Sequence, residues 1–263
     1  MLGGGAALAV LQKVAMAQSA LVGSPSLTEG PYFVDEDMNR NDIRVDPADG
    51  SIQPGFPLSL GIKVSQLRNG AEVPLTGAYV DVWHCNAAGV YSDIAQQAST
   101  GKKYLRGYQA TNRHGQAYFL TVYPGWYMGR AVHIHVKVRV FNGEDQTYEF
   151  TSQFFFDDAF FDEIFKLSPY NTRPGRDTLN STDSIYRGSS NTGTITTDSG
   201  SYLMLTTQKK ASWVEAEAKL ICDLSLGSSP DQTPGGGGGP GGMPPGSGPG
   251  GPPPGGPPPT PPA

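Results

Sequence analysis

The sequence predicts an all-β protein: one β-sandwich domain of mostly antiparallel strands, with a short helix and long loops. Two observations support this prediction. Short alternating segments rich in Val, Ile, Tyr, Phe and Thr recur along the chain, and clusters of Gly, Asn, Asp and Pro separate them. Between two ends of unusual composition lie roughly 200 residues, which is an ordinary size for a single all-β domain.

Five segments have the residue types and the two-residue period of strands: 58–64, 78–85, 117–122, 132–141 and 148–156. Hairpin turns are predicted at 112–115 and 142–143, because Asn and Gly tolerate the positive φ angles that such turns need. A short helix is predicted over 159–167, where Asp157 and Asp158 supply the capping side chains.

Residues 214–226 carry two conflicting signals. The stretch Ala-Glu-Ala-Glu-Ala-Lys-Leu has a strong helix propensity, but apolar residues occupy every second position from Val214 to Leu226. We follow the two-residue period and predict a strand.

The ends of the chain are set apart from the predicted domain, residues 24–226. Residues 1–17 are small and apolar and end in Ala-Met-Ala, which has the pattern of a signal peptidase site, so they are a predicted export leader. A buried N-terminal helix is the alternative. Residues 227–263 are predicted to be a disordered tail, because Gly and Pro bury too little apolar surface to offset the entropy of ordering. We therefore expect an exported protein that is secreted, periplasmic or associated with the cell envelope.

Charge and hydropathy exclude two classes of partner. The formal net charge is -5 and only 16% of residues are charged, so no basic surface for nucleic acid is expected. No segment after residue 20 reaches the 18 or more apolar residues of a membrane span. The two cysteines, Cys85 and Cys222, leave two alternatives: one disulfide in an oxidising compartment, or two buried free thiols.

His133 and His135 begin the strand-like run His-Ile-His-Val-Lys-Val-Arg-Val. The two-residue period of a strand places both imidazoles on one face and Ile134, Val136 and Val138 on the other. Because the Cα atoms of residues i and i+2 lie roughly 6 to 7 Å apart, the two ring nitrogens can converge on one metal ion.

A pair of histidines by itself is compatible with several kinds of site. A cupin would have a carboxylate shortly after the second histidine, yet residues 136–142 contain no Asp or Glu. A zinc enzyme would need a third His, Cys or carboxylate ligand, and neither His84 nor His114 has an obvious claim to that role.

Longer motifs narrow the choice. Asp-Val-Trp-His-Cys-Asn-Ala-Ala-Gly-Val-Tyr (81–91) and Tyr-Pro-Gly-Trp-Tyr-Met-Gly-Arg-Ala-Val-His-Ile-His (123–135) resemble the intradiol ring-cleavage dioxygenase family, in particular its small exported members, which are related to catechol and protocatechuate dioxygenases. Thr-Glu-Gly-Pro-Tyr-Phe (28–33) and Ser-Gln-Phe-Phe-Phe (152–156) also fall where that family has matching segments. The resemblance covers most of residues 26–190.

The resemblance implies a ferric ion, Fe(III), held by Tyr91, Tyr123, His133 and His135. Two phenolates and two imidazoles suit a hard, oxidised iron. Tyr127 is a rival for the second phenolate, because the spacing from Tyr123 to the histidines is shorter than in the larger catechol and protocatechuate enzymes. We prefer Tyr123 because it precedes a proline, as the family's ligand does.

The resemblance also implies roles for four further residues. Arg130 would lie beside the bound ring, where its charge stabilises negative charge that develops during the reaction; its alternative role is a salt bridge to Asp or Glu on a neighbouring loop. Gln153 would form a hydrogen bond within the site, or be an ordinary buried amide. Pro31 and Tyr32 would form part of the wall of the substrate cavity, or pack there without a role in binding.

The implied activity is oxidative cleavage of a catechol-type aromatic diol between its two hydroxylated carbons, with both atoms of O2 incorporated into a muconate-type diacid. The expected partners are therefore a small aromatic diol and O2. Two alternatives remain. An exported β-sandwich binding or adhesion module, with the Gly/Pro-rich tail as a stalk, would bind no metal, and a cupin-like oxygenase with ferrous iron would be colourless.

Overall fold

The strands of this chain form two sheets in the computed structural model, which describes residues 23–188 and 198–228. The strands of these described residues are β1 (Pro57–Arg68), β2 (Ala71–Pro74), β3 (Tyr79–Trp83), β4 (Arg106–Ala110), β5 (Gln116–Val122), β6 (His133–Asn142), β7 (Asp145–Phe155), β8 (Thr206–Lys209) and β9 (Val214–Cys222). The helix α1 (Asp158–Ile164) follows β7, and short 3-10 turns lie at Ala95–Gln97, Tyr170–Thr172, Ser199–Leu203 and Leu224–Leu226. The predicted leader, residues 1–17, and residues 229–263 of the predicted tail lie outside the described residues.

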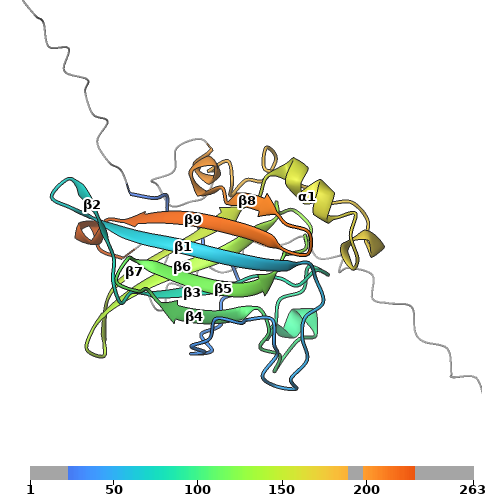
Figure 1. The fold of residues 1–263 in the computed structure, drawn as a ribbon, viewed down its shortest axis with the longest axis horizontal. Coiled ribbons are helices and arrows are strands. Elements are labelled where there is room, and N and C mark those ends of the chain that lie inside the picture. Colours follow the sequence, from blue (N-terminus) through green and yellow to red (C-terminus); the bar gives the residue numbers. More distant parts are fainter. Residues whose placement is uncertain (1–22, 189–197, 229–263) are drawn as a thin grey trace, which may run out of the picture. The chain divides into compact units, whose positions relative to one another are not determined.

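The pairing of the strands gives a mostly antiparallel sandwich. One sheet has the order β2-β1-β9-β8, with β5 also paired to β1, and the other has the order β4-β3-β6-β7. The pair β1 and β9 is parallel, whereas the other strand pairs of the described residues are antiparallel. Figure 1 shows β1 and β9 side by side although they lie far apart in the sequence. The predicted all-β sandwich is confirmed.

The individual elements agree with the sequence to different degrees. All five predicted strands form, as does the strand predicted at 214–226, although it ends at Cys222. The short strands β2, β4 and β8 were not predicted. The helix begins one residue earlier than expected and ends at Ile164, and the Asp157 carboxylate caps it by accepting from the Phe160 amide at 2.9 Å.

The two predicted turns differ in what they connect. Residues 142–143 join β6 to β7 as a hairpin within one sheet, as expected. Residues 112–115 form a tight turn, in which the Gly115 amide donates to the Asn112 carbonyl at 2.9 Å, but the turn joins β4 to β5 in different sheets. It therefore carries the chain from one layer of the sandwich to the other rather than closing a hairpin.

Strand β6 is buried on both faces. Ile134, Val136 and Val138 pack in the core between the sheets, together with apolar residues of β1, β3, β5, β7 and β9. The opposite face carries His133, His135, Lys137 and Arg139, and these side chains are buried as well. The predicted division of the strand into a histidine face and an apolar face is therefore confirmed, and loops cover the polar face.

The N-terminal segment provides much of this cover. The Leu27 amide donates to the Thr151 carbonyl of β7, which ties the segment to the edge of the sheet. Further along, Lys137 of β6 forms an ion pair with Glu29 at 2.5 Å, and Arg139 forms one with Asp35 at 2.9 Å. Cations of β6 thus hold residues 29–35 over the same face that bears the histidines.

Both cysteines are buried and free. Cys85 lies in the loop that follows β3, where its thiol donates to the Gly125 carbonyl at 3.5 Å, whereas Cys222 packs in the core between the sheets. Of the two alternatives for the cysteines, the structure shows the pair of free thiols. None of the helices in the described residues has the length and apolar character needed to cross a membrane.

Candidate functional site

The two histidines lie at the start of β6, on its loop-covered face. His135 is paired in register with Trp83 of β3 on one side and with Gln153 of β7 on the other, so all three side chains share this face. The His135 ring stacks on the Trp83 indole with centroids 4.8 Å apart and an angle of 10° between the planes. Stacking on a large flat ring limits the rotation of His135.

Tyr91 reaches the histidines from the loop that follows β3. Asn86 shapes this loop, because its side-chain oxygen accepts from the amides of Ala88 at 2.9 Å and Val90 at 3.1 Å. Gly89 has a φ of +79°, a conformation that favours glycine. The tight turn brings the Tyr91 ring to a fully buried position beside β6.

Tyr127 comes from the loop between β5 and β6, which packs closely against the loop of Tyr91. A Cβ atom on Gly125 would lie 2.4 Å from the Ala87 carbonyl oxygen, so only glycine permits this approach. Arg173 joins the two loops by donating to the carbonyls of Ala87 at 3.3 Å and Trp126 at 2.9 Å. The two loops that carry the tyrosines are thereby held as one unit.

Four side chains meet at one point. The Nε2 atoms of His133 and His135 lie 3.2 Å apart, and His133 Nε2 lies 3.3 Å from the Tyr91 hydroxyl and 3.0 Å from the Tyr127 hydroxyl. The rings of Tyr91 and Tyr127 contact edge to face, with centroids 5.7 Å apart. Two imidazole nitrogens and two phenol oxygens therefore converge in a buried space.

The tautomer of His133 leaves a lone pair in this cluster. Its Nδ1 lies 2.6 Å from the Ala131 carbonyl oxygen, which can only accept, so Nδ1 carries the proton and Nε2 is unprotonated. That single lone pair faces two hydroxyls, a second imidazole and the Arg130 guanidinium, more partners than it can accept from. A cation at the centre would use the donors of all four side chains, so this arrangement fits a metal ion.

Burial sets the protonation states of the four groups. It lowers the pKa of His133 and of His135 well below the ordinary histidine value, an effect to which Arg130 adds, so both rings are neutral. Burial raises the pKa of Tyr127 to about 12, although Arg130 opposes this, and raises the pKa of Tyr91 well above its usual range. A bound cation would favour the phenolate forms, since it supplies the charge that the buried oxygens lack.

Tyr123, the expected second phenolate, does not join this group. Its ring is fully buried on the other side of the loop, against Phe156 at 4.3 Å and edge to face with Tyr170 at 6.4 Å between centroids. Its hydroxyl has no hydrogen-bond partner among the described residues. The structure therefore places the rival, Tyr127, beside the histidines and Tyr123 away from them, because the chain reaches the histidines only four residues after Tyr123.

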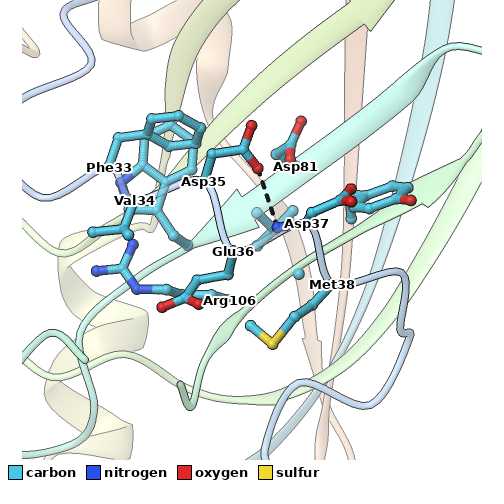
Figure 2. A pocket seen from close by; sticks show the side chains of 12 residues that line it. Phe33, Val34, Asp35, Glu36, Asp37, Met38, Asp81 and Arg106 are labelled. Carbon is cyan, nitrogen blue, oxygen red and sulfur yellow. Dashed lines mark hydrogen bonds between the residues drawn. The ribbon is translucent and has the colours of Figure 1, made fainter. Parts of the chain in front are cut away.

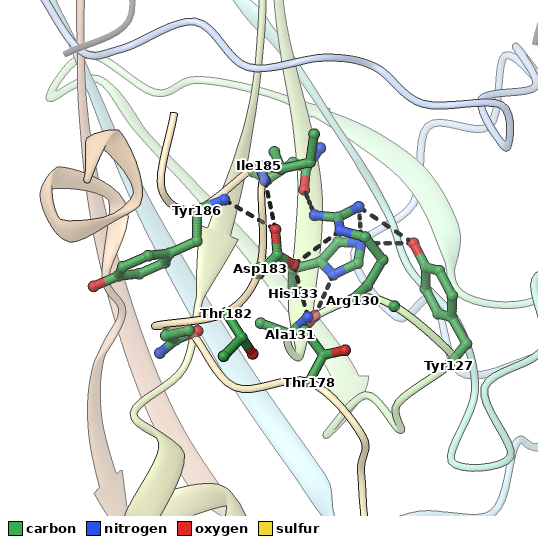
Figure 3. A network of polar contacts seen from close by, with 12 residues as sticks. Tyr127, Arg130, Ala131, His133, Thr178, Thr182, Asp183, Ile185 and Tyr186 are labelled. Atoms are coloured by element: carbon green, nitrogen blue, oxygen red, sulfur yellow. Dashed lines mark hydrogen bonds and ion pairs between the residues drawn. The ribbon is translucent and has the colours of Figure 1, made fainter. Parts of the chain in front are cut away.

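Arg130 and Gln153 lie beside the cluster, as the sequence predicted. Arg130 Nη1 is 3.4 Å from His133 Nε2 and 3.5 Å from the Tyr127 hydroxyl, while Nη2 donates to the side-chain oxygen of Gln153. Arg130 also forms the ion pair that was its alternative role, with Asp183 at 2.9 Å. Figure 3 shows Arg130 and His133 between Tyr127 on one side and Asp183 on the other.

The segment 28–33 passes over the cluster. Tyr32 stacks on Tyr91 with centroids 4.6 Å apart and touches Tyr127 edge to face at 6.0 Å. Gly30 has a φ of +70°, and a Cβ atom there would lie 3.4 Å from a carbon of the His135 ring. Tyr32 thus covers the site, whereas Pro31 is exposed to solvent.

A small pocket lies next to the cluster and not within it (Figure 2). It is lined by residues 33–38 of the N-terminal segment and by residues of β3 and β4, among them Asp81, Trp83 and Arg106. Trp83 belongs to both places, because its ring also stacks on His135.

Sequence reasoning missed two residues at the site. Trp83 could have been found from the strand period, since it is paired in register with His135 and shares its face of the sheet. Asp183 carried no such signal, because it is a single carboxylate in an irregular segment far along the chain.

The described residues offer no alternative set of common metal ligands. Within 23–188 and 198–228, no three His, Cys, Asp or Glu side chains are grouped so that they could hold a metal ion.

Comparison with known proteins gives consistent matches. A protein family described as Dioxygenase matches residues 28–174. An intradiol ring-cleavage dioxygenase from Tetranychus urticae is 27% identical, covers 78% of this chain and 96% of its own, and has a TM-score of 0.63.

Two further solved structures are similar to this chain. The dioxygenase domain of a dioxygenase carbohydrate-binding protein fusion from Streptomyces sp. SirexAA-E is 25% identical, covers 77% of this chain and 99% of its own, and has a TM-score of 0.52. A 3-chlorocatechol 1,2-dioxygenase from Rhodococcus opacus 1CP, at 20% identity, 76% and 71% coverage and a TM-score of 0.52, shares the fold. No curated protein sequence is significantly similar to this chain.

Proposed function

Because this chain belongs to the intradiol ring-cleavage dioxygenase family, we propose that it cleaves a catechol-type aromatic diol with O2 at a ferric ion held by Tyr91, Tyr127, His133 and His135. Membership of the family supports an oxidoreductase that acts on aromatic diols. The observation that carries the finer proposal is the convergence of two phenol oxygens and two imidazole nitrogens, with the Nε2 atoms 3.2 Å apart.

The chemistry of the four donors favours ferric iron over other metals. Anionic oxygen ligands stabilise the oxidised state of iron, and neutral imidazoles complete a set without thiolates. When bound there, ferric iron would withdraw electron density from the diol and so open the ring to attack by O2.

The residues around the site would prepare the diol. A phenolate oxygen of Tyr91 or Tyr127 is placed to accept the proton of a substrate hydroxyl, because both oxygens lie at the point where the diol would meet the ion. The Nη1 atom of Arg130 faces the same point, so its charge would stabilise negative charge developing on the ring oxygens. Gln153 holds the other end of this guanidinium.

The cover over the site would exclude water. Tyr32 lies on Tyr91, and Gly30 approaches His135, so the segment 28–33 closes the cluster on that side. Exclusion of water strengthens the interaction of Arg130 with the developing charge and protects the reacting ring from side reactions. Tyr32 therefore remains part of the proposed substrate-binding wall, next to Pro31.

The product of this reaction would be a muconate-type diacid that contains both atoms of O2. We propose in addition that the protein is exported and meets its substrates outside the cytoplasm, among lignin- or plant-derived phenols. This part of the proposal rests on residues 1–17 and on their resemblance to a signal peptide.

The absorption spectrum of the purified protein tests the proposal. With ferric iron added, phenolate coordination should give a red-brown protein, and the visible band should shift when catechol is added without oxygen. Admission of O2 should then consume one O2 per diol and release a diacid. His135→Ala should abolish the band.

Two other outcomes would contradict the proposal. A colourless protein that consumes no O2 would favour a binding or adhesion module. A colourless ferrous protein that is active would favour the cupin-like alternative.

A further inference from the structure

Asp183 is a buried carboxylate that no part of the proposed chemistry uses. Its side chain is fully buried, and it follows the residues matched by the Dioxygenase family, which end at 174. Figure 3 shows it between the loop of Arg130 and the segment that contains Ile185 and Tyr186. A buried charge of this kind is costly unless several donors surround it.

The two oxygens of Asp183 serve different parts of the chain. Oδ1 accepts from the amides of Ile185 at 2.7 Å and Tyr186 at 3.0 Å, so it shapes the turn that Asp183 itself begins. Oδ2 accepts from Arg130 Nε at 2.9 Å and from the Ala131 amide at 2.7 Å. The second oxygen therefore acts entirely on the loop that leads into the histidine strand.

The bond to Arg130 determines where its charge points. Asp183 holds Nε and Gln153 holds Nη2, which leaves Nη1 directed at Tyr127 and His133. A guanidinium is planar, so two fixed nitrogens determine the position of the third. Without the carboxylate, the guanidinium could turn away from the cluster.

The bond to Ala131 reaches the metal ligands by a second route. Ala131 donates its amide to Asp183 and accepts, at its carbonyl, the Nδ1 proton of His133 at 2.6 Å. That contact sets the tautomer which leaves the Nε2 lone pair of His133 in the cluster. One carboxylate oxygen therefore supports both Arg130 and the orientation of a proposed ligand.

We propose that Asp183 is a positioning residue that orients Arg130 and the Ala131 carbonyl toward the metal cluster, an inference that rests on the proposed function. It acts through these two neighbours and does not touch the reacting atoms. The residue lies in an irregular segment after residue 174, where the family match ends. A part of the chain beyond the matched residues therefore supports the site.

The first measurement uses the metal-free protein and the Asp183→Asn variant. Asparagine keeps an oxygen for the backbone amides but loses the charge that fixes Arg130. In the native protein, the Arg130 Nε proton should exchange slowly and give a nitrogen-15 NMR signal, assigned by its absence in Arg130→Gln. In Asp183→Asn this signal should exchange at least about 10-fold faster, since a buried charge-assisted bond has been lost.

The second measurement is made after loading with ferric iron. Asp183→Asn should lower kcat about 10- to 100-fold, the range typical of partners that orient metal ligands, with a smaller change in KM and a shifted visible band. The matched control is Asp81→Asn, which breaks another buried carboxylate–arginine pair, with Arg139 at 2.6 and 2.8 Å, whose hydrogen bonds do not reach the four side chains of the cluster. The control should lower thermal stability without shifting the band.

A double variant separates positioning from loss of folding. Asp183→Asn/Arg130→Gln removes the unpaired buried charge and should fold even where Asp183→Asn does not. Asp183→Asn should lower kcat less in the Arg130→Gln background than in the native protein, since only one of the two routes of Asp183 runs through Arg130 and the route through Ala131 remains. A double variant slower by the product of both single effects would overturn the proposal, as would a slowly exchanging Arg130 signal in Asp183→Asn. Because the NMR measurement needs no iron, it decides the role of Asp183 even if the native protein proves to bind none.

Discussion

The loop between β5 and β6 places two tyrosines in opposite surroundings. Tyr127 lies among polar groups, with its hydroxyl 3.0 Å from His133 Nε2 and within reach of Arg130. Tyr123, four residues earlier, lies among aromatic rings of α1 and the segment that follows β7, and its hydroxyl has no partner among the described residues. Tyr123 is fully buried whereas Tyr127 is partly exposed, so deeper burial does not mark the tyrosine that lies beside the histidines.

The difference shows that one loop can place one tyrosine in the apolar core and another beside the histidines. Tyr123 continues the line of β5, where its amide donates to the Phe56 carbonyl at 2.8 Å, and its ring fills the apolar space beside α1. After Pro124 and Gly125, the chain turns toward the loop of Tyr91. The turn, and not the tyrosine itself, decides which phenol meets the histidines.

The largest expected effect is that of Tyr127→Phe. Loss of a direct ligand should cost at least about 100-fold in kcat, the upper end of what loss of an orienting partner costs. The visible band should lose intensity or shift strongly, as measured by titration with ferric iron. A variant that keeps the full band and normal ring cleavage would show that Tyr127 is not a ligand.

Acid should destabilise the folded protein, because burial keeps its histidines neutral. Burial lowers the pKa of His84 to about 4, from 6.5, and His133 and His135 shift in the same direction. Between those pH values the unfolded chain binds a proton that the folded chain does not. The free energy of unfolding of the metal-free protein should therefore fall as pH decreases from about 6.5 to 4, by about 3 kcal/mol for His84 alone.

Urea unfolding at a series of pH values measures this slope. His84→Gln cannot titrate, so it should flatten the slope while leaving the contributions of His133 and His135 in place. An identical slope in the native protein and in His84→Gln would rule out His84 as a source of acid sensitivity.

The smallest effect is expected for Tyr123→Phe. This substitution removes a buried hydroxyl that has no partner, so the free energy of unfolding should rise by about 1 kcal/mol. The visible band and kcat should match those of the native protein, in contrast to Tyr127→Phe. A loss of colour in Tyr123→Phe would reverse the assignment of the two tyrosines.

Much of the site could be predicted where local geometry decides it. The two-residue period of a strand is enough to put His133 and His135 on one face, and the structure confirms that division of β6. The same period identified β9, although its residues favour a helix, because alternate positions face the core. The turn at 142–143 followed in the same way from residues that tolerate positive φ.

Elements that depend on distant partners were less predictable. The short strands β2, β4 and β8 have weak patterns and form by pairing with β1, β3 and β9. The turn at 112–115 has the residues of a hairpin, yet the strands that it joins pair with β3 and β1 in separate sheets.

The sequence by itself determined the class of fold, the shared face of the two histidines and the family to which their motif belongs. Only the tertiary structure decided that Tyr127 and not Tyr123 lies beside the histidines, that Trp83 stacks on His135 and that Asp183 forms an ion pair with Arg130. The physical reason is the distance along the sequence over which the deciding interactions act. A strand's period is set by backbone geometry within a few residues, whereas the path of a loop depends on contacts such as Gly125 against Ala87, which only the folded chain brings together.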